Sequence, residues 1–390
     1  MNWRYRNTVL LLLMGAFFST MVARLSISPL VPDIIATFQV SKGAVGLALT
    51  GMWAAYALMQ LPGGVLADRY GERPVILAAI ALTGLASALL ATSPAYLAFV
   101  AFTALLGAGT GLYFPAATSL LTKLYRNTGQ AIGFHISGGD SAGLVTPALA
   151  VYVGLRYGWH AGLALGAVVA LPVLALAAWR IRATPPTHGG RTLREQVDLR
   201  VLARLLTNPA IAYTILLAVI LAFTFQATLS FFPTFLVEYW GVSTARASLL
   251  FAGLFALWIL TSPLLGRLSD VVGRDAVLAL ATVAMAVGIV LLLTVTAGPL
   301  ALLGVAFLGG GMGWGGVIAS RFMDNLSEAD GSTGYGLVRL VYVLLGSLGS
   351  VVTGALADAS GWPVAFGLVV VLLLFAGTTL GAVRLLALDL

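Results

Sequence analysis

The chain has no cysteine and only three histidines among its 390 residues. Without cysteine there is no disulfide framework and no thiol chemistry, and the scattered histidines lack the spacing of a metal site. These absences exclude thiol-dependent redox enzymes and zinc proteins. We therefore expect neither a bound metal nor a cofactor.

Charge is also scarce: Asp, Glu, Lys and Arg make up 9% of the residues, whereas 60% are hydrophobic. The mean hydropathy is +1.00, far above that of soluble domains, about a quarter of whose residues are charged. An apolar run of about 18 or more residues predicts a transmembrane helix. Twelve such runs lie near 8–32, 43–67, 74–92, 95–119, 129–153, 160–182, 209–234, 246–268, 275–297, 299–323, 332–356 and 362–386. We predict an all-α membrane protein with twelve transmembrane helices.

The net charge of +7 comes from basic residues at the ends of these runs, which indicates membrane orientation and not nucleic-acid binding. With the N-terminus in the cytoplasm, sixteen basic residues lie on that side and three, Lys42, Arg156 and Arg246, lie outside. We predict a multi-pass protein of the plasma (inner) membrane with both termini in the cytoplasm. The first run contains Arg24 and no small-residue cleavage site, so we interpret it as a retained helix and not as a signal peptide.

A polar stretch, "ATPPTHGGRTLREQVDLRVLARLLTNP" (183–209), separates two sets of six runs. We predict an N-terminal bundle at 1–182, a cytoplasmic linker at 183–208 and a C-terminal bundle at 209–390. A shift of 202 residues aligns 40–71 with 242–273 without a gap, and Gly64, Asp68 and Gly71 meet identical residues. Such parallel repeats are typical of transporters with two pseudo-symmetric bundles and a site between them near the bilayer midplane.

The segment "GGVLADRYGER" (63–73) matches the loop signature Gly-x-x-x-Asp-Arg-x-Gly-x-Arg of the major facilitator superfamily, and "GRLSDVVGR" (266–274) is a weaker second copy. The chain resembles this superfamily over its whole length. The resemblance implies a monomeric alternating-access transporter and not an enzyme. It also implies that the two loops latch one conformation, with gating residues Asp68, Arg69, Arg73, Asp270 and Arg274. A turn carrying ordinary cytoplasmic positive charges would use the same residues and stays an alternative.

Two short motifs resemble those of soluble enzymes. "GDSAG" (139–143) fits the nucleophile elbow of serine hydrolases, and "GMGWGG" (311–316) fits a dinucleotide-binding turn. Both enzyme motifs require a preceding strand, whereas these segments lie inside apolar runs. Close helix packing by glycine is the better interpretation of both.

Three charged residues lie well inside apolar runs: Arg24, Asp140 and Arg339. A charge at the centre of a membrane helix costs about 2.5–3.5 kcal/mol on insertion scales, which makes such residues candidates for function. Arg24 and Asp140 lie at depths that would let them pair. The pair either only holds the bundle together, or Arg24 attracts an anionic substrate while Asp140 is its resting partner and the proton-binding group.

The element "RLSISPLVPDI" (24–34) resembles helix 1 of the anion:cation symporters, which carry organic anions such as glutamate and sialic acid. This resemblance implies proton-coupled symport of a small organic anion such as a carboxylate. Two departures matter. Thr103 and Thr110 stand where those carriers have an Arg and a Glu, so proton coupling is assigned to Asp140. Helix 7 offers Gln226 and not an Arg, which argues against a doubly charged organophosphate.

Further candidates for the substrate site are polar or aromatic residues in later helices: Tyr113, Gln226, Trp258, Trp314, Arg339 and Tyr342. Ordinary bundle packing is the alternative for the aromatic residues, and snorkelling to the headgroups is the alternative for Arg339. At the level of function, the main rival is a drug or metabolite efflux antiporter of the same superfamily. A membrane enzyme or a receptor without transport is a further alternative.

Overall fold

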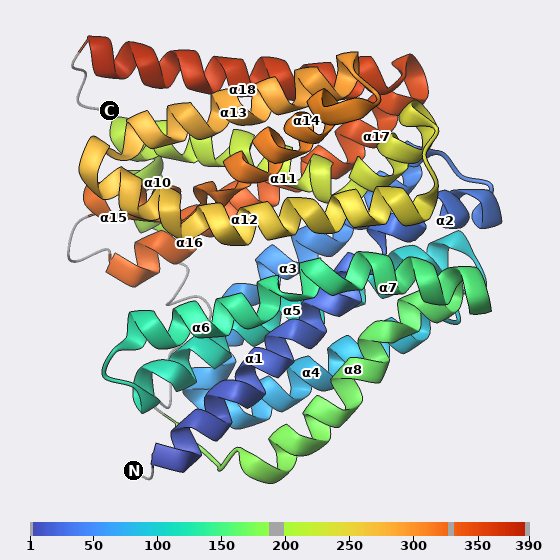
Figure 1. Ribbon diagram of the computed structural model, residues 1–390. Coiled ribbons are helices and arrows are strands. Elements are labelled where there is room, and N and C mark those ends of the chain that lie inside the picture. Colours follow the sequence, from blue (N-terminus) through green and yellow to red (C-terminus); the bar gives the residue numbers. More distant parts are fainter. Residues whose placement is uncertain (1–2, 187–198, 327–330, 387–390) are drawn as a thin grey trace. The chain divides into compact units, whose positions relative to one another are not determined.

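The structure, a computed structural model, describes residues 3–186, 199–326 and 331–386, and every regular element in these ranges is a helix (Figure 1). The elements of the first half are α1 Trp3–Leu25, η1 Ser28–Leu30, α2 Val31–Phe38, α3 Lys42–Tyr70, α4 Glu72–Leu90, α5 Tyr96–Leu124, α6 Thr128–Asp140, α7 Ala142–Tyr157 and α8 Trp159–Arg180. Those of the second half are α10 Leu199–Thr207, α11 Pro209–Trp240, α12 Thr244–Val272, α13 Arg274–Thr294, α14 Gly298–Gly311, η2 Met312–Trp314, α15 Gly315–Asn325, α16 Gly331–Gly346, α17 Leu348–Ser360 and α18 Trp362–Leu385.

Eleven helical stretches of the described chain are long and apolar enough to cross a membrane. The fifth predicted span, 129–153, falls on α6 and α7, two helices of 13 and 16 residues that meet at Ser141. This segment is not among the eleven, although the two helices together cover it. The fold is an all-α membrane fold, as the apolar runs predict.

The chain divides into two compact units. Unit 1 contains Met1–Val40 and Ala48–Gln196, and unit 2 contains Ser41–Leu47 and Val197–Leu390. The break after position 196 falls within the linker predicted at 183–208, whose residues 187–198 lie outside the described part. The domain bounds predicted from the sequence stay a prediction.

The helix bounds follow the repeat found in the sequence. Helices α3 and α12 have 29 residues each, and both ends of α12 lie 202 residues after those of α3. Glycine precedes the next helix in both halves: Gly71 has φ +84° and Gly273 has φ +95°. Side chains rarely adopt this backbone region, so both signature loops require glycine there.

Glycine also brings α6 against α1 inside unit 1. A Cβ atom added at Gly139 would lie 2.0 Å from Cδ1 of Phe17, and one at Gly138 would lie 2.7 Å from Cβ of Met14. The "GDSAG" segment is helical on both sides of Ser141. Its first glycine therefore serves helix packing, and the strand of a nucleophile elbow does not precede it.

The second glycine-rich motif, "GMGWGG", forms the junction of α14, η2 and α15. An added Cβ atom at Gly311 would lie 2.5 Å from Cγ of Met285, and one at Gly313 would lie 2.9 Å from Cα of Ser262. These glycines let neighbouring helices approach closely, and a helix, not a strand, precedes the motif.

Candidate functional site

Arg24 lies in the last turn of α1, and its side chain is only 5% exposed. Nε donates a hydrogen bond to the carbonyl oxygen of Thr20 at 3.3 Å, and the Nη2 atom lies 2.9 Å from Sδ of Met21. The end of a helix carries partial negative charge, which stabilises a cation there. Local structure therefore offsets part of the cost of burying this charge.

Two aromatic rings of α3 also hold the guanidinium group of Arg24. Its Cζ atom lies 4.9 Å from the ring centroid of Trp53 and 4.9 Å from that of Tyr56. The two rings pack edge to face, with centroids 5.5 Å apart. Cation–π contacts of this kind stabilise a desolvated cation by about 2 kcal/mol. The sequence alone does not single out Trp53 and Tyr56, although their spacing of three residues places them on one helix face.

Asp140 ends α6, beside the break before α7. Helix α1 packs against α6, and the positive charge of Arg24 acts on the Asp140 carboxyl group. Unit 1 thus brings together two residues that are more than a hundred positions apart. Whether their interaction is structural or part of transport stays a prediction.

Tyr113 occupies a fully buried cluster with His135 in unit 1. Its hydroxyl group donates a hydrogen bond to the carbonyl oxygen of Leu13 at 2.6 Å and lies 3.0 Å from Nε2 of His135. The hydroxyl proton points to Leu13, so the histidine must carry its proton on Nε2 and donate it to the tyrosine oxygen. The Phe17 ring stacks on His135 with centroids 5.0 Å apart. The hydroxyl group of Tyr113 thus already has hydrogen-bond partners inside unit 1. The substrate role of Tyr113 stays a prediction.

Two of the predicted substrate residues in unit 2 have buried polar atoms that lack hydrogen-bond partners within the described part of the chain. They are Oε1 of Gln226 on α11 and Nε1 of Trp314 in η2, and both side chains are less than a tenth exposed. A buried polar atom left unpaired costs about 1–3 kcal/mol. An acceptor and a donor in this state can bind a polar ligand without first breaking an internal bond.

The remaining candidates of unit 2 lie among aromatic rings. Trp258 on α12 packs edge to face against Phe225, with centroids 5.2 Å apart. Tyr342 on α16 stacks on Phe322 with centroids 6.0 Å apart, and it interacts with Arg339 one turn earlier on the same helix. These contacts are compatible with both packing and a substrate role.

The predicted gating residues form contacts within each unit. In unit 2, Arg274 forms ion pairs with Asp270, which lies one turn earlier, and with Asp324 at 3.3 Å. In unit 1, the Nη2 atom of Arg73 donates to the carbonyl oxygen of Ala178 at 2.7 Å. Arg69 is exposed and lies 5.4 Å from the ring centroid of Tyr70.

Asp68 is half-buried near the end of α3. The contacts of Arg69, Arg73 and Arg274 described above each lie within a single unit, so they do not test gating. The roles of all five predicted gating residues stay predictions.

Glu72 of the first signature loop is a further buried charge that the sequence pattern does not single out. Its side chain is fully buried, forms an ion pair with Lys123 and accepts a hydrogen bond from Oγ of Ser119 at 2.9 Å. The hydroxyl oxygen of Thr184 accepts from the backbone N–H of Glu72 at 2.8 Å. These partners lie 47 or more residues away along the chain, so no local pattern predicts them.

The chain is similar in sequence to a known protein family and to several known proteins. Residues 12–257 and 214–388 match the family described as Major Facilitator Superfamily. The chain is 26% identical over 196 residues to a probable sulfoacetate transporter, SauU, of Cupriavidus necator, which covers 50% of this chain and 46% of that protein. It is also 26% identical over 191 residues to the membrane sensor protein UhpC of Escherichia coli, covering 48% and 44%. The matches thus span less than half the length of these relatives.

A solved structure resembles the whole chain. It is the crystal structure of a bacterial homologue of the human lysosomal transporter Spinster in an inward-facing, unoccupied conformation. The two chains share a TM-score of 0.81 over 97% of each, at 20% sequence identity. At this identity the likeness establishes a common fold.

Proposed function

Since the chain belongs to the major facilitator superfamily, we propose that it is a proton-coupled transporter that takes up a small organic anion, such as a carboxylate or sulfonate. The observation that carries the proposal is the buried guanidinium group of Arg24. Two neutral acceptors and two aromatic faces hold this group in place. A guanidinium group fixed in this way presents a permanent positive charge and planar N–H donors, which suit an anionic substrate.

Asp140 supplies the proposed coupling to protons. The carboxylate and an anionic substrate compete for the charge of Arg24. A proton on Asp140 removes this competition, so binding of the proton and of the anion favour each other, and linkage makes the effect reciprocal. A proton gradient can then drive accumulation of the anion.

The similarity to a sulfoacetate transporter supports an anionic substrate, because sulfoacetate is a small organic anion. In unit 2, Gln226 and Trp314 stay predicted substrate residues, and their unpaired polar atoms can accept and donate a hydrogen bond. We place the transporter in the plasma membrane as a monomer, with both termini in the cytoplasm.

The similarity to a membrane sensor protein favours one other candidate, a receptor that binds the anion without moving it. Two measurements on the purified chain separate the candidates. A thermal-shift screen with sulfoacetate, simple carboxylates, inorganic phosphate and a hydrophobic cation shows which class binds the folded state. Uptake of the stabilising compound into proteoliposomes under an imposed pH gradient then shows whether it is transported.

We expect an organic anion to raise the melting temperature and to accumulate when the outside is acidic. Binding without accumulation would support the sensor, and it would contradict the transport proposal. If only the hydrophobic cation stabilises the chain, and a proton gradient drives this cation out of the proteoliposomes, the result would instead support the efflux antiporter.

A further inference from the structure

Four side chains of unit 2, from four helices, meet on the predicted outer side. Nζ of Lys42 lies 3.2 Å from Oε2 of Glu238 and 3.6 Å from Oδ1 of Asp358. Nε1 of Trp362 donates to Oε2 of Glu238 at 3.0 Å, and the Trp362 ring centroid lies 5.8 Å from Nζ of Lys42. We call these four residues the outer cluster. One lysine thus joins the starts of α3 and α18 to the ends of α11 and α17.

Asp358 also binds the backbone at the start of α3. Its Oδ1 atom accepts from the N–H group of Lys42 at 3.1 Å, and its Oδ2 atom accepts from that of Gly43 at 2.7 Å. The first N–H groups of a helix lack partners inside the helix, and the positive end of the helix dipole favours a carboxylate. Asp358 is therefore a helix cap of α3, although 316 residues separate it from Lys42.

Both carboxylates of the outer cluster lie near the C-terminal ends of their own helices, Glu238 in α11 and Asp358 in α17. A helix end carries partial negative charge, which disfavours a carboxylate there. The start of α3 therefore supplies the positive charge that neither carboxylate finds in its own helix.

Glycine lets the start of α3 lie directly on α17. A Cβ atom added at Gly46 would lie 2.5 Å from the carbonyl oxygen of Ser350, and one added at Gly354 would lie 2.5 Å from the carbonyl oxygen of Lys42. Side chains at these two positions would separate the helices. The close contact keeps Asp358 within reach of the first N–H groups of α3.

Helix α3 belongs to both units. Ser41–Leu47 belong to unit 2, and the rest of the helix belongs to unit 1. The helix is continuous over 29 residues, and its internal proline, Pro62, lies well inside unit 1. Alternating access requires one bundle to move against the other. Such a movement must either bend the start of this continuous helix or open the outer cluster.

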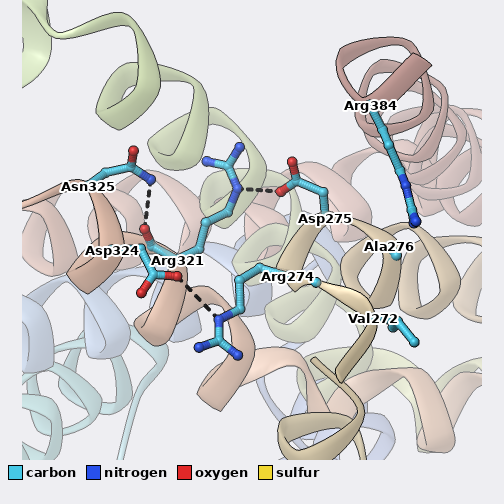
Figure 2. Close-up of a pocket in the computed structure, with 9 residues that line it drawn as sticks. Val272, Arg274, Asp275, Ala276, Arg321, Asp324, Asn325 and Arg384 are labelled. Atoms are coloured by element: carbon cyan, nitrogen blue, oxygen red, sulfur yellow. Dashed lines mark hydrogen bonds and ion pairs between the residues drawn. The ribbon is translucent and has the colours of Figure 1, made fainter. Parts of the chain in front are cut away.

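The ion pairs on the predicted cytoplasmic side of unit 2 differ from the outer cluster (Figure 2). Arg321 pairs with Asp275 at 2.6 Å, and Arg274 pairs with Asp324 at 3.3 Å. Both pairs join α13 to α15, which lie wholly within unit 2, and the Arg321 side chain is only 4% exposed. The three charged side chains of the outer cluster are 21% to 36% exposed. Water can therefore solvate them when the cluster opens, whereas breaking a buried pair leaves an unpaired charge.

We propose that the outer cluster is a latch. It holds the start of α3 on α11 and α17 between transport steps, and it opens once in each cycle, when unit 1 moves. The proposal rests on the proposed transport function, but it does not depend on which substrate is carried. Asp358 is its central residue, because it binds both the ammonium group and the backbone at the start of α3.

The labelling rate of a single thiol measures how often the latch opens. A Cβ atom at Gly43 lies 3.3 Å from Cβ of Ala355, so the thiol of Gly43→Cys is covered by α17 while the latch is closed. The unmodified chain has no cysteine, and a water-soluble maleimide is applied to the purified full-length protein. Asp358→Asn and Lys42→Gln are each added to this variant. Arg246→Gln is the matched control, since Arg246 is an exposed cation on the predicted outer side of the same unit.

We expect slow labelling of Gly43→Cys and about tenfold faster labelling after either latch substitution, because a lost charge-assisted hydrogen bond shifts an equilibrium by about this factor. The Arg246→Gln control should leave the rate unchanged. Rapid labelling with the latch residues intact, or unchanged rates with both Asp358→Asn and Lys42→Gln, would overturn the proposal.

A second thiol position detects unfolding. Ala247 is fully buried on α12, so Ala247→Cys should stay unlabelled when it is combined with either latch substitution. Labelling of Ala247→Cys with both substitutions would show that the outer cluster holds the fold together, and it would overturn the latch.

A disulfide tests whether transport requires the opening. The Cβ separation between positions 43 and 355 is close to that of a disulfide, so oxidation should link Gly43→Cys to Ala355→Cys. Uptake of sulfoacetate into proteoliposomes should stop in the linked chain and return after reduction, with Ala355→Cys alone as the control. Uptake by the linked chain would contradict the latch. If the reduced chain takes up no sulfoacetate, the proposed substrate is wrong, and the labelling rates still decide whether the latch exists.

Discussion

At the scale of single residues, the chain concentrates its buried charge at a few places. Arg24 lies between a helix end and two aromatic rings, in a region of unit 1 that also contains Asp140. A charge buried in this way requires compensation, and a substrate can supply part of it. The two interpretations of the pair, structural and functional, make different predictions.

We expect Arg24→Ala to lower anion uptake about 100-fold or more, because charge-assisted hydrogen bonds contribute about 1.5–3 kcal/mol each. Arg24→Lys should also lose most of its activity, since an ammonium group lacks the planar fork of N–H donors. Uptake into proteoliposomes measures both, with the exposed Arg156→Ala of the same unit as the control. Uptake at the level of the unmodified chain in Arg24→Ala would refute the assignment.

Protein yield and melting temperature test the structural interpretation of the pair. If Arg24 only balances Asp140, Arg24→Ala will fail to fold, and the double variant with Asp140→Ala will restore folding, because no buried charge is then left unpaired. A folded but inactive Arg24→Ala supports the substrate role.

Asp140→Asn is expected to separate binding from coupling. Asparagine imitates the protonated carboxyl group, so the variant should keep substrate binding and exchange across the membrane. It should lose accumulation driven by a pH gradient, because no proton is released in the cycle. Exchange and gradient-driven uptake are measured in the same vesicles. A variant that still concentrates substrate with only a proton gradient would show that coupling lies elsewhere.

At the scale of elements, the same loop occurs twice but with different surroundings. Both signature loops place a glycine at positive φ before a helix, Gly71 before α4 and Gly273 before α13. A Cβ atom added at Gly71 would lie 2.2 Å from the carbonyl oxygen of Thr184, whereas one added at Gly273 would meet nothing within 4 Å. The segment after α8 therefore packs on the first loop.

This difference predicts unequal effects of the same substitution. Gly273→Ala should cost about 1–3 kcal/mol, the strain of a side chain in this backbone region. Gly71→Ala should cost more, because Thr184 must also move and lose its hydrogen bond with the N–H group of Glu72. Melting temperatures of the two variants, compared with the unmodified chain, check the order. Equal losses would mean that the contact with Thr184 does not stabilise the loop.

At the scale of the whole molecule, the chain forms two helical units with repeated helix bounds and belongs to a transporter superfamily. The distribution of basic residues predicts its orientation in the membrane. The absence of cysteine makes this orientation simple to test, because a single introduced thiol reacts without background.

Thr207→Cys on α10 and Ala245→Cys on α12 place a thiol at exposed positions on opposite predicted sides. With a membrane-impermeant thiol reagent on intact cells, we expect labelling of Ala245→Cys and protection of Thr207→Cys. Permeabilised cells should show labelling of both, which controls for accessibility. Labelling of Thr207→Cys alone in intact cells would reverse the predicted orientation.

The amino-acid sequence is sufficient to predict a helical membrane protein with two repeated halves. These properties depend on hydrophobicity over local windows and on self-similarity at a shift of 202 residues, which can be read without knowing any contact. It also identified Arg24 and Asp140, because a charge within an apolar run is itself a local signal.

The surroundings of these charges, in contrast, depend on how the helices pack. Trp53 and Tyr56 lie beneath Arg24, Tyr113 shares a buried cluster with His135, and Asp358 caps the start of α3. In a soluble helix, the spacing of apolar residues shows which face is buried. A membrane helix is apolar on most of its faces, so this spacing does not show which face contacts which neighbouring helix. Partners separated by tens or hundreds of residues are chosen by helix packing, and packing depends on where glycine lets two helices approach.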